Sequence, residues 1–180
     1  MYVVLMAMLA LNISTEVLNG FSIVEESLNR TTSNSSKENE SIYSDFLEQM
    51  KTNPEKVKAW FDKATMVKQM SDSLYNYAQS LKEQIVKEAD GDDADLNNIV
   101  GKDNLEAAAH VMLAPGTGQG KKLYDAINSY RERILKMVND DHQRQLIAEN
   151  LSTKIPKKGN ALGKNWQEYM FESMPVAAAV

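Results

Sequence analysis

The feature that most constrains this 180-residue sequence is a long run between residues 57 and 85 in which apolar or small residues recur every three or four positions. This spacing puts their side chains on one face of an α-helix, whereas a half-buried strand would alternate apolar and polar residues. The positions with this three- and four-residue spacing are Val57, Trp60, Ala64, Val67, Ser71, Leu74, Ala78, Leu81 and Ile85. Asn53, Pro54 and Glu55 form a helix start signal, and Gly91 allows a left-handed turn after an end near Ala89. Such a helix is about 50 Å long, a length typical of bundles, coiled coils and spacers.

The rest of the chain also predicts helices. No segment alternates over strand lengths, and 8 glycines and 4 prolines are few for a β-rich fold. We therefore predict an all-α fold. We expect a helix from the start of the chain to about Asn29, and a Ser/Thr/Asn-rich loop over residues 31–41. Shorter helices are expected around residues 42–50, from Asp103 to before Pro115, over 123–138, around Trp166 and after Pro175, with a basic loop over 154–164.

The first eleven residues, MYVVLMAMLAL, are uncharged and almost wholly apolar. They would cover about half of a bilayer, which needs about 20 such residues. They lack the basic start and the cleavage site of a signal peptide. The segment is either a buried core helix or the outer half of a membrane helix. A helical stripe through Val3, Met6, Ala10, Ile13, Val17, Phe21, Val24 and Leu28 runs from it into polar sequence and favours the membrane helix. We expect the chain to be a fragment of a longer protein, because it also stops one turn into its last predicted helix.

Composition excludes several classes of function. There is no cysteine, which removes disulfides, Cys-ligated metals and thiol catalysis. The net charge of -5 does not attract nucleic acid or anionic lipid to the chain as a whole.

The motifs that suggest ligand binding fail on spacing. Counted from Asp90, an EF-hand needs an oxygen ligand at position 5 and glycine at position 6, where this chain has Ala94 and Asp95. Only three residues separate Gly116 from Gly120, one too few for a phosphate-binding P-loop, so we interpret this segment as a turn between helices.

The two histidines do not suggest a shared site. His110 and His142 lie 32 positions apart, with no spacing typical of a metal site, and we interpret them as a helix residue and a surface residue. No catalytic triad is legible. We therefore predict no catalytic, cofactor-binding or metal-binding residue and no enzyme.

Two segments resemble a known family. MYVVLMAMLALNISTEVLNGF is similar to the membrane helix of the GldM/PorM family of gliding-motility and secretion proteins, and FESMPVAAAV resembles the end of that family's first periplasmic domain. The resemblance implies a transmembrane helix over residues 1–20 and a periplasmic helical bundle over residues 21–180. It also implies an inner-membrane homodimer whose membrane helices sit in a ring of a polytopic GldL/PorL partner. Proton flow through this type IX secretion motor would drive a shaft toward further periplasmic and outer-membrane components.

The resemblance also directs attention to particular residues. Candidates for the transmembrane interface are Tyr2, Met6, Leu9, Ala10, Asn12, Ile13, Glu16 and Val17. Gly20 is a candidate hinge, because glycine costs about 1 kcal/mol relative to alanine inside a helix. The resemblance implies a basic proton-coupling residue ahead of the apolar run, so no such residue is named in this sequence.

Two other functions remain open. In a membrane-anchored periplasmic sensor, a membrane helix would also continue into a helical bundle. Such a sensor would need a pocket with convergent polar groups to bind a small ligand. A soluble all-α scaffold protein would use residues 1–11 as part of its core.

Overall fold

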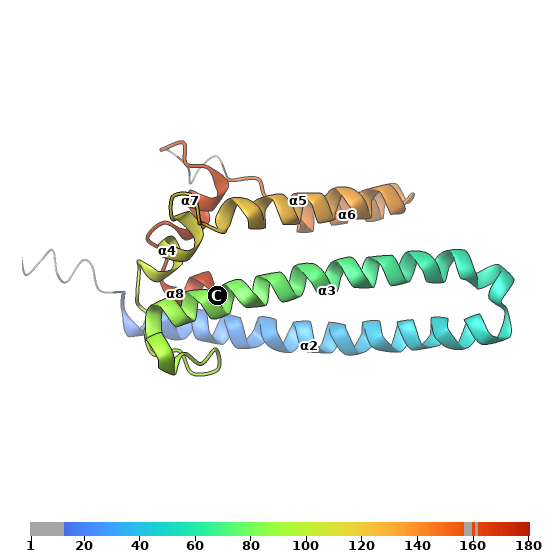
Figure 1. The fold of residues 1–180 in the computed structure, drawn as a ribbon, viewed down its shortest axis with the longest axis horizontal. Helices are drawn as coiled ribbons and strands as arrows, with labels where there is room; N and C mark the ends of the chain where they lie inside the picture. Colours follow the sequence, from blue (N-terminus) through green and yellow to red (C-terminus); the bar gives the residue numbers. More distant parts are fainter. Residues whose placement is uncertain (1–12, 157–159, 161) are drawn as a thin grey trace, which may run out of the picture. The chain divides into compact units, whose positions relative to one another are not determined.

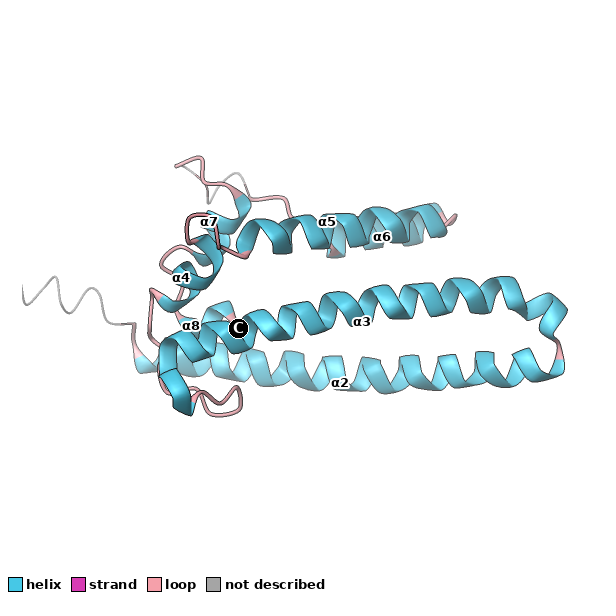
Figure 2. Ribbon diagram, in the orientation of Figure 1, coloured by secondary structure: helices cyan, strands magenta, loops and turns pink. Residues whose placement is uncertain are grey.

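The computed structural model describes residues 13–156, 160 and 162–180, and within these ranges every regular element is a helix (Figures 1 and 2). The predicted all-α class is therefore confirmed. The long helices are α2 (Thr15–Thr52), α3 (Pro54–Asp90) and α5 (Gly120–Met137). The shorter elements are the 3-10 turn η1 (Gly91–Asp93), α4 (Ala107–Leu113), α6 (Asp141–Asn150), α7 (Trp166–Phe171) and α8 (Val176–Ala179). No helix in the described ranges is both long and apolar enough to cross a membrane.

Helix α2 corrects one prediction. It continues unbroken for 38 residues through positions 31–41, where the sequence predicted a loop. Ser, Thr and Asn each cost only about 0.5 kcal/mol in a helix, and this stretch has neither glycine nor proline to stop propagation. The predicted end near Asn29 and the separate helix at 42–50 were therefore wrong, because both belong to one helix.

Helix α3 begins and ends close to the predicted residues. Asn53 separates it from α2, Pro54 is its first residue, and Glu55 lies in its first turn, where its negative charge suits the helix dipole. It ends at Asp90, one residue beyond the prediction, and Gly91 follows with φ +72°. The cap signals and the apolar spacing therefore located this helix correctly.

The chain divides into two compact units. Unit 1 comprises the residues up to Ser27 together with Ser80–Lys121 and Ile155–Val180, and unit 2 comprises Leu28–Gln79 and Lys122–Lys154. Helices α2 and α3 are each divided between the units, with one segment in unit 1 and the other in unit 2.

Unit 1 contains most of the buried apolar side chains. Helix α4 packs against α7 and α8, and the end of the chain is bound by two backbone hydrogen bonds, from Val176 N to Asn104 O (3.1 Å) and from Ala177 N to Lys102 O (3.1 Å). The core consists of Leu81, Ile85, Val86, Ile99, Ala107, Ala108, Met112, Phe171, Val176 and Ala177. The predicted helix after Pro175 is confirmed as α8, and its first residues are part of this core.

Unit 2 is bound together largely by polar contacts. Tyr43 of α2 stacks on Phe61 of α3 with ring centroids 5.5 Å apart, and its hydroxyl lies 3.1 Å from Thr65 Oγ1. On α5, the Arg131 guanidinium donates to Leu151 O at 2.9 Å. Among the described residues of this unit, only Ile134 and Thr153 are buried, and they keep 8% and 9% of their surface exposed.

The sequence did not predict α6. Its N-cap is Asp140, whose side chain accepts from Gln143 N at 2.8 Å. Arg144, in its first turns, donates to Leu135 O and to Val138 O at the end of α5. These bonds satisfy carbonyl groups that a helix end leaves without partners.

Candidate functional site

The start of α2 is the part of the predicted membrane interface that the structure describes. Ile13 is half-buried, whereas Glu16 and Val17 are exposed. Ser14 starts the helix, because its carbonyl accepts from Val17 N (3.1 Å) and Leu18 N (3.2 Å). The other predicted interface residues, Tyr2, Met6, Leu9, Ala10 and Asn12, lie outside the described residues, so the interface remains a prediction.

Gly20, the candidate hinge, lies inside α2 in regular helix. A methyl group added at this position would meet no atom within 4 Å. No packing contact therefore requires glycine here. Its effect is on the helix backbone alone, so its role as a hinge remains a prediction.

One contact near the start of α2 was not anticipated from the sequence. The Lys102 ammonium donates to Ser22 Oγ at 3.1 Å and so ties α2 to the loop before α4, within unit 1. The two residues are 80 positions apart, and no local pattern relates them. Only the folded structure could reveal this pair.

The stripe of apolar residues on α2 is largely exposed along the described helix. Val17, Val24 and Leu28 are 49%, 56% and 61% exposed. Their spacing of seven and four residues is that of one helix face, as in the seam of a coiled coil. This face is a candidate surface for association with another helix.

In the acidic loop after α3, Asp90 and Asp95 accept hydrogen bonds from backbone amides. The Asp90 carboxylate accepts from Val100 N at 2.9 Å and from Gly101 N at 2.7 Å, and Asp95 accepts from Asn97 N at 2.8 Å. Within the described ranges, no group of three or more His, Asp or Glu side chains could hold a metal ion.

The glycines of the 116–120 segment allow a tight turn between α4 and α5, as predicted. Gly116 has φ +78°, which favours glycine. A Cβ atom on Gly120 would lie 2.7 Å from the Gln167 Cβ and 2.8 Å from Met112 O. The structure thus explains these residues by close packing.

The two histidines belong to different units, His110 to unit 1 and His142 to unit 2. His110 is exposed on α4, with its Nδ1 atom 2.9 Å from Glu88 Oε1, and His142 is exposed on α6. Neither belongs to an assembled catalytic group in the described part of the chain.

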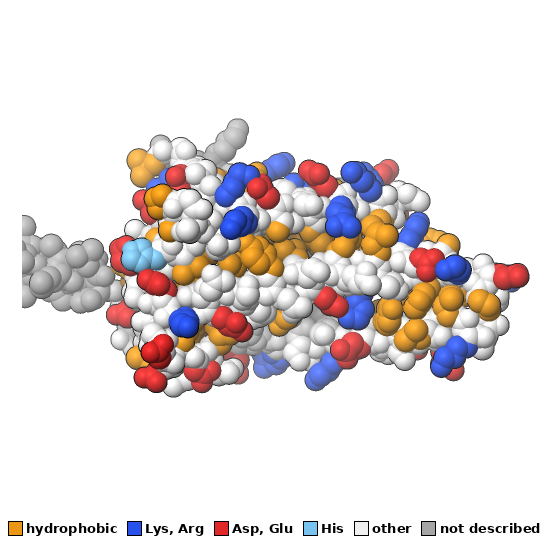
Figure 3. Space-filling view, viewed as in Figure 1, with side chains coloured by type: hydrophobic (Ala, Val, Ile, Leu, Met, Phe, Trp, Pro, Cys, Tyr) orange, Lys and Arg blue, Asp and Glu red, His pale blue; other side chains and the backbone are white. Residues whose placement is uncertain are grey.

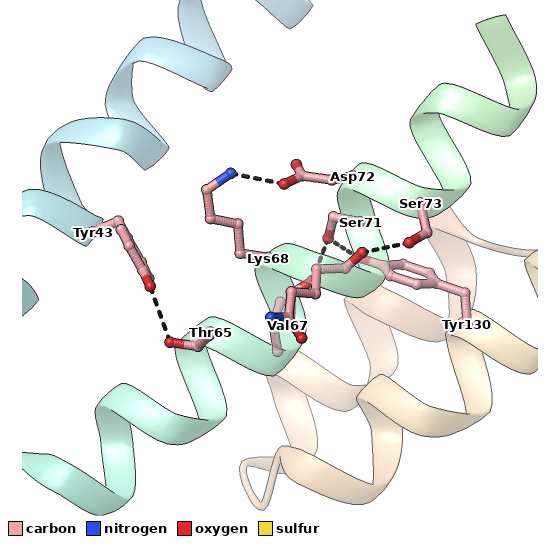
Figure 4. A network of polar contacts seen from close by, with 9 residues as sticks. Tyr43, Thr65, Val67, Lys68, Ser71, Asp72, Ser73 and Tyr130 are labelled. Carbon is pink, nitrogen blue, oxygen red and sulfur yellow. Dashed lines mark hydrogen bonds and ion pairs between the residues drawn. The ribbon is translucent and has the colours of Figure 1, made fainter.

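Helices α3 and α5 meet in unit 2 through a hydroxyl pair (Figure 4). Ser71 Oγ lies 2.7 Å from the Tyr130 hydroxyl and also donates to Val67 O at 2.9 Å. Two residues further along α3, Ser73 Oγ donates to Gln69 O at 2.8 Å. Lys68 pairs with Asp72 at 2.7 Å, and this hydrogen bond raises the pKa of the Lys68 ammonium.

A groove opens beside this pair, between α3 and α5, with a volume of about 410 Å³. Its α3 side is formed mainly by Met66, Met70, Leu74 and Tyr77. Burial raises the pKa of the Tyr77 phenol. The sequence did not indicate this groove, because the apolar stripe predicted on α3 includes Leu74 but not Met66, Met70 or Tyr77.

Together, the long helices, the exposed apolar face and the polar contacts between helices define an all-helical domain suited to structural and protein-binding roles. The model of the GldM N-terminal domain matches residues 16–180, and the chain belongs to this family. This confirms the resemblance and associates the chain with gliding motility and type IX secretion. No curated protein matches the sequence.

Proposed function

We propose that this chain forms the shaft of a dimeric inner-membrane motor of the type IX secretion and gliding machinery. In this proposal residues 1–20 cross the inner membrane and residues 21–180 lie in the periplasm. The membrane helices of two copies sit within a ring of a polytopic GldL/PorL-like partner. Proton flow through the ring moves the shaft, which acts on further periplasmic and outer-membrane components of the secretion system.

The observation that carries the proposal is the continuity of α2. The helix begins at Thr15, four positions after the last residue of the apolar segment, and runs without a break to Thr52. At 1.5 Å per residue it extends about 57 Å. A continuous helix transmits torque and tilt, whereas a flexible linker would dissipate them. Gly20 is the one glycine within it and is our proposed hinge.

The exposed face of α2 supports the homodimer. Val17, Val24 and Leu28 present apolar side chains to solvent at the spacing of a helix–helix seam. Pairing of two copies along this face would remove these side chains from water and extend the pairing of the membrane helices into the periplasm.

Disulfide cross-linking tests the proposal directly, because residues 1–180 contain no cysteine. Single cysteines are placed at each position from Tyr2 to Glu16 of the full-length protein, and native membranes are then oxidised. We expect cross-links to a second copy and to a polytopic partner, each recurring every three to four positions. Asp92→Cys, at an exposed residue of the η1 turn, controls for random collision. The proposal is wrong if no position cross-links and the protein remains in the soluble fraction.

A further inference from the structure

The groove between α3 and α5 is an apolar surface within unit 2. Met66, Met70, Leu74 and Tyr77 follow one another on α3 at intervals of four, four and three residues, so they form one stripe along about three turns. Figure 3 shows apolar side chains gathered along these two helices. Met66 is 46% exposed although it lines the groove. Met70, Leu74 and Tyr77 are half-buried, so the stripe is accessible to solvent at Met66 and partly covered beyond it.

The shape of the groove favours a helix as its occupant. Small-molecule sites enclose most of their ligand, whereas this groove is open along its length. An amphipathic helix binds such a surface by laying apolar residues at three- and four-residue spacing into it. Methionine suits this role because its flexible, polarisable side chain adapts to different partners.

The walls of the groove are fixed by hydrogen bonds. The Tyr130 hydroxyl on α5 is bonded to Ser71 on α3, which joins the two helices beside the apolar stripe. Gln69 and Ser73 add polar groups to the lining, and their own bond runs along α3. An apolar centre with polar groups around it is the usual composition of a protein-binding surface.

Charge defines the chemistry of the partner. Arg133 on α5 is the only charged residue in the lining of the groove, and it is exposed. Within the described ranges no carboxylate lies within ion-pair distance of its guanidinium. A guanidinium pairs well with a carboxylate, since its fork of donors matches the two oxygens.

We propose that this groove binds an amphipathic helix of a partner protein, with its apolar face on the methionine stripe and an Asp or Glu paired with Arg133. This inference goes beyond the motor function and depends on unit 2 alone. Charge complementarity at Arg133 would set the direction and register of the bound helix, because the groove has no second charge to compete with it.

A displayed library of 18-residue amphipathic helices tests the proposal. The apolar positions are fixed at three- and four-residue spacing, the flanking positions are randomised, and the library is selected on the whole 180-residue chain. We expect enrichment of Asp or Glu at one flanking position. The affinity of an enriched peptide should fall about tenfold with Arg133→Glu, which reverses the charge, and less with Arg133→Lys, which keeps the charge but loses the fork of donors. Arg30→Glu, which removes an exposed cation from α2, should leave the affinity unchanged.

A second variant tests the apolar half of the site. Met66→Gln should lower the affinity for the same peptide. Because Met66 is 46% exposed, the change should leave the fold intact, and an unchanged helical circular dichroism signal checks this. Enrichment without an acidic preference, or no enrichment at all, would overturn the proposal. So would a concentration-dependent dimer that Met66→Gln dissociates, because the groove would then belong to a second copy of this chain.

Discussion

At the scale of single residues, Asp90 links the end of α3 to the loop that follows it. Its two carboxylate oxygens accept from the backbone amides of Val100 and Gly101, and so close the loop after α3. Replacing Asp90 with alanine leaves both donors without this partner, and the free energy of unfolding should fall by about 1–3 kcal/mol. Equilibrium denaturation measures this loss. The matched change Asp92→Ala, at an exposed residue of the same acidic run, should cost less than about 0.5 kcal/mol. Equal effects of the two changes would contradict the role assigned to Asp90.

The sequence predicts that the acidic run is a loop, but it does not indicate that Asp90 accepts hydrogen bonds from the backbone. The amides it binds lie ten and eleven positions further along the chain, and no spacing rule relates a carboxylate to such distant donors. Local signals were more reliable. Pro54 at the start of α3 and Gly91 after its end act through their own backbone conformations, which depend little on the rest of the fold.

At the scale of helices, the sequence prediction and the structure differ in the polar middle of α2, which was predicted as a loop and is helical. If residues 31–41 were a loop, a proline there would be tolerated, whereas in a helix it removes a hydrogen bond and costs about 3 kcal/mol. Ser35→Pro, at an exposed position of α2, should therefore reduce the helical circular dichroism signal and the midpoint of thermal unfolding. Ser35→Ala is the matched control and should preserve or slightly raise both. An unchanged signal with proline would mean that α2 is broken at this point.

The errors at this scale have a common physical origin. Apolar spacing identifies a helix by the face it buries, and it located α3 and α5 because both have such a face. Positions 31–41 of α2 are exposed throughout and have no apolar face to detect, so their helix rests on propagation from the flanking turns. Helix α6 was missed for a similar reason, because its only half-buried side chains are Arg144 and Ile147 and its start depends on the Asp140 cap.

At the scale of the whole molecule, sequence and structure contribute different parts of the functional conclusion. The family was evident from the apolar start and from the final segment of the sequence, and the match over residues 16–180 confirmed it. The division into two units and the groove in unit 2 were not predicted. Both depend on contacts between helices, and the repeating spacing of α3 gives no sign of which turns will be covered.

The two units differ in how they are stabilised, and this predicts an order of opening. Every buried apolar side chain of the described residues except Ile134 belongs to unit 1, and the Val, Leu, Ile, Phe and Met side chains among them each contribute about 1.5–3 kcal/mol when fully buried. Unit 2 relies instead on hydroxyl pairs such as Ser71–Tyr130, which contribute about 1 kcal/mol each. Local opening follows this difference, since regions with few buried apolar contacts open at lower free energy. In native-state hydrogen exchange, amides of residues 124–137 in α5 should therefore exchange at least about tenfold faster than those of residues 81–86 in α3. Equal protection of both segments would show that the long helices make the two units open together, and the polar contacts of unit 2 would then not be its weak point.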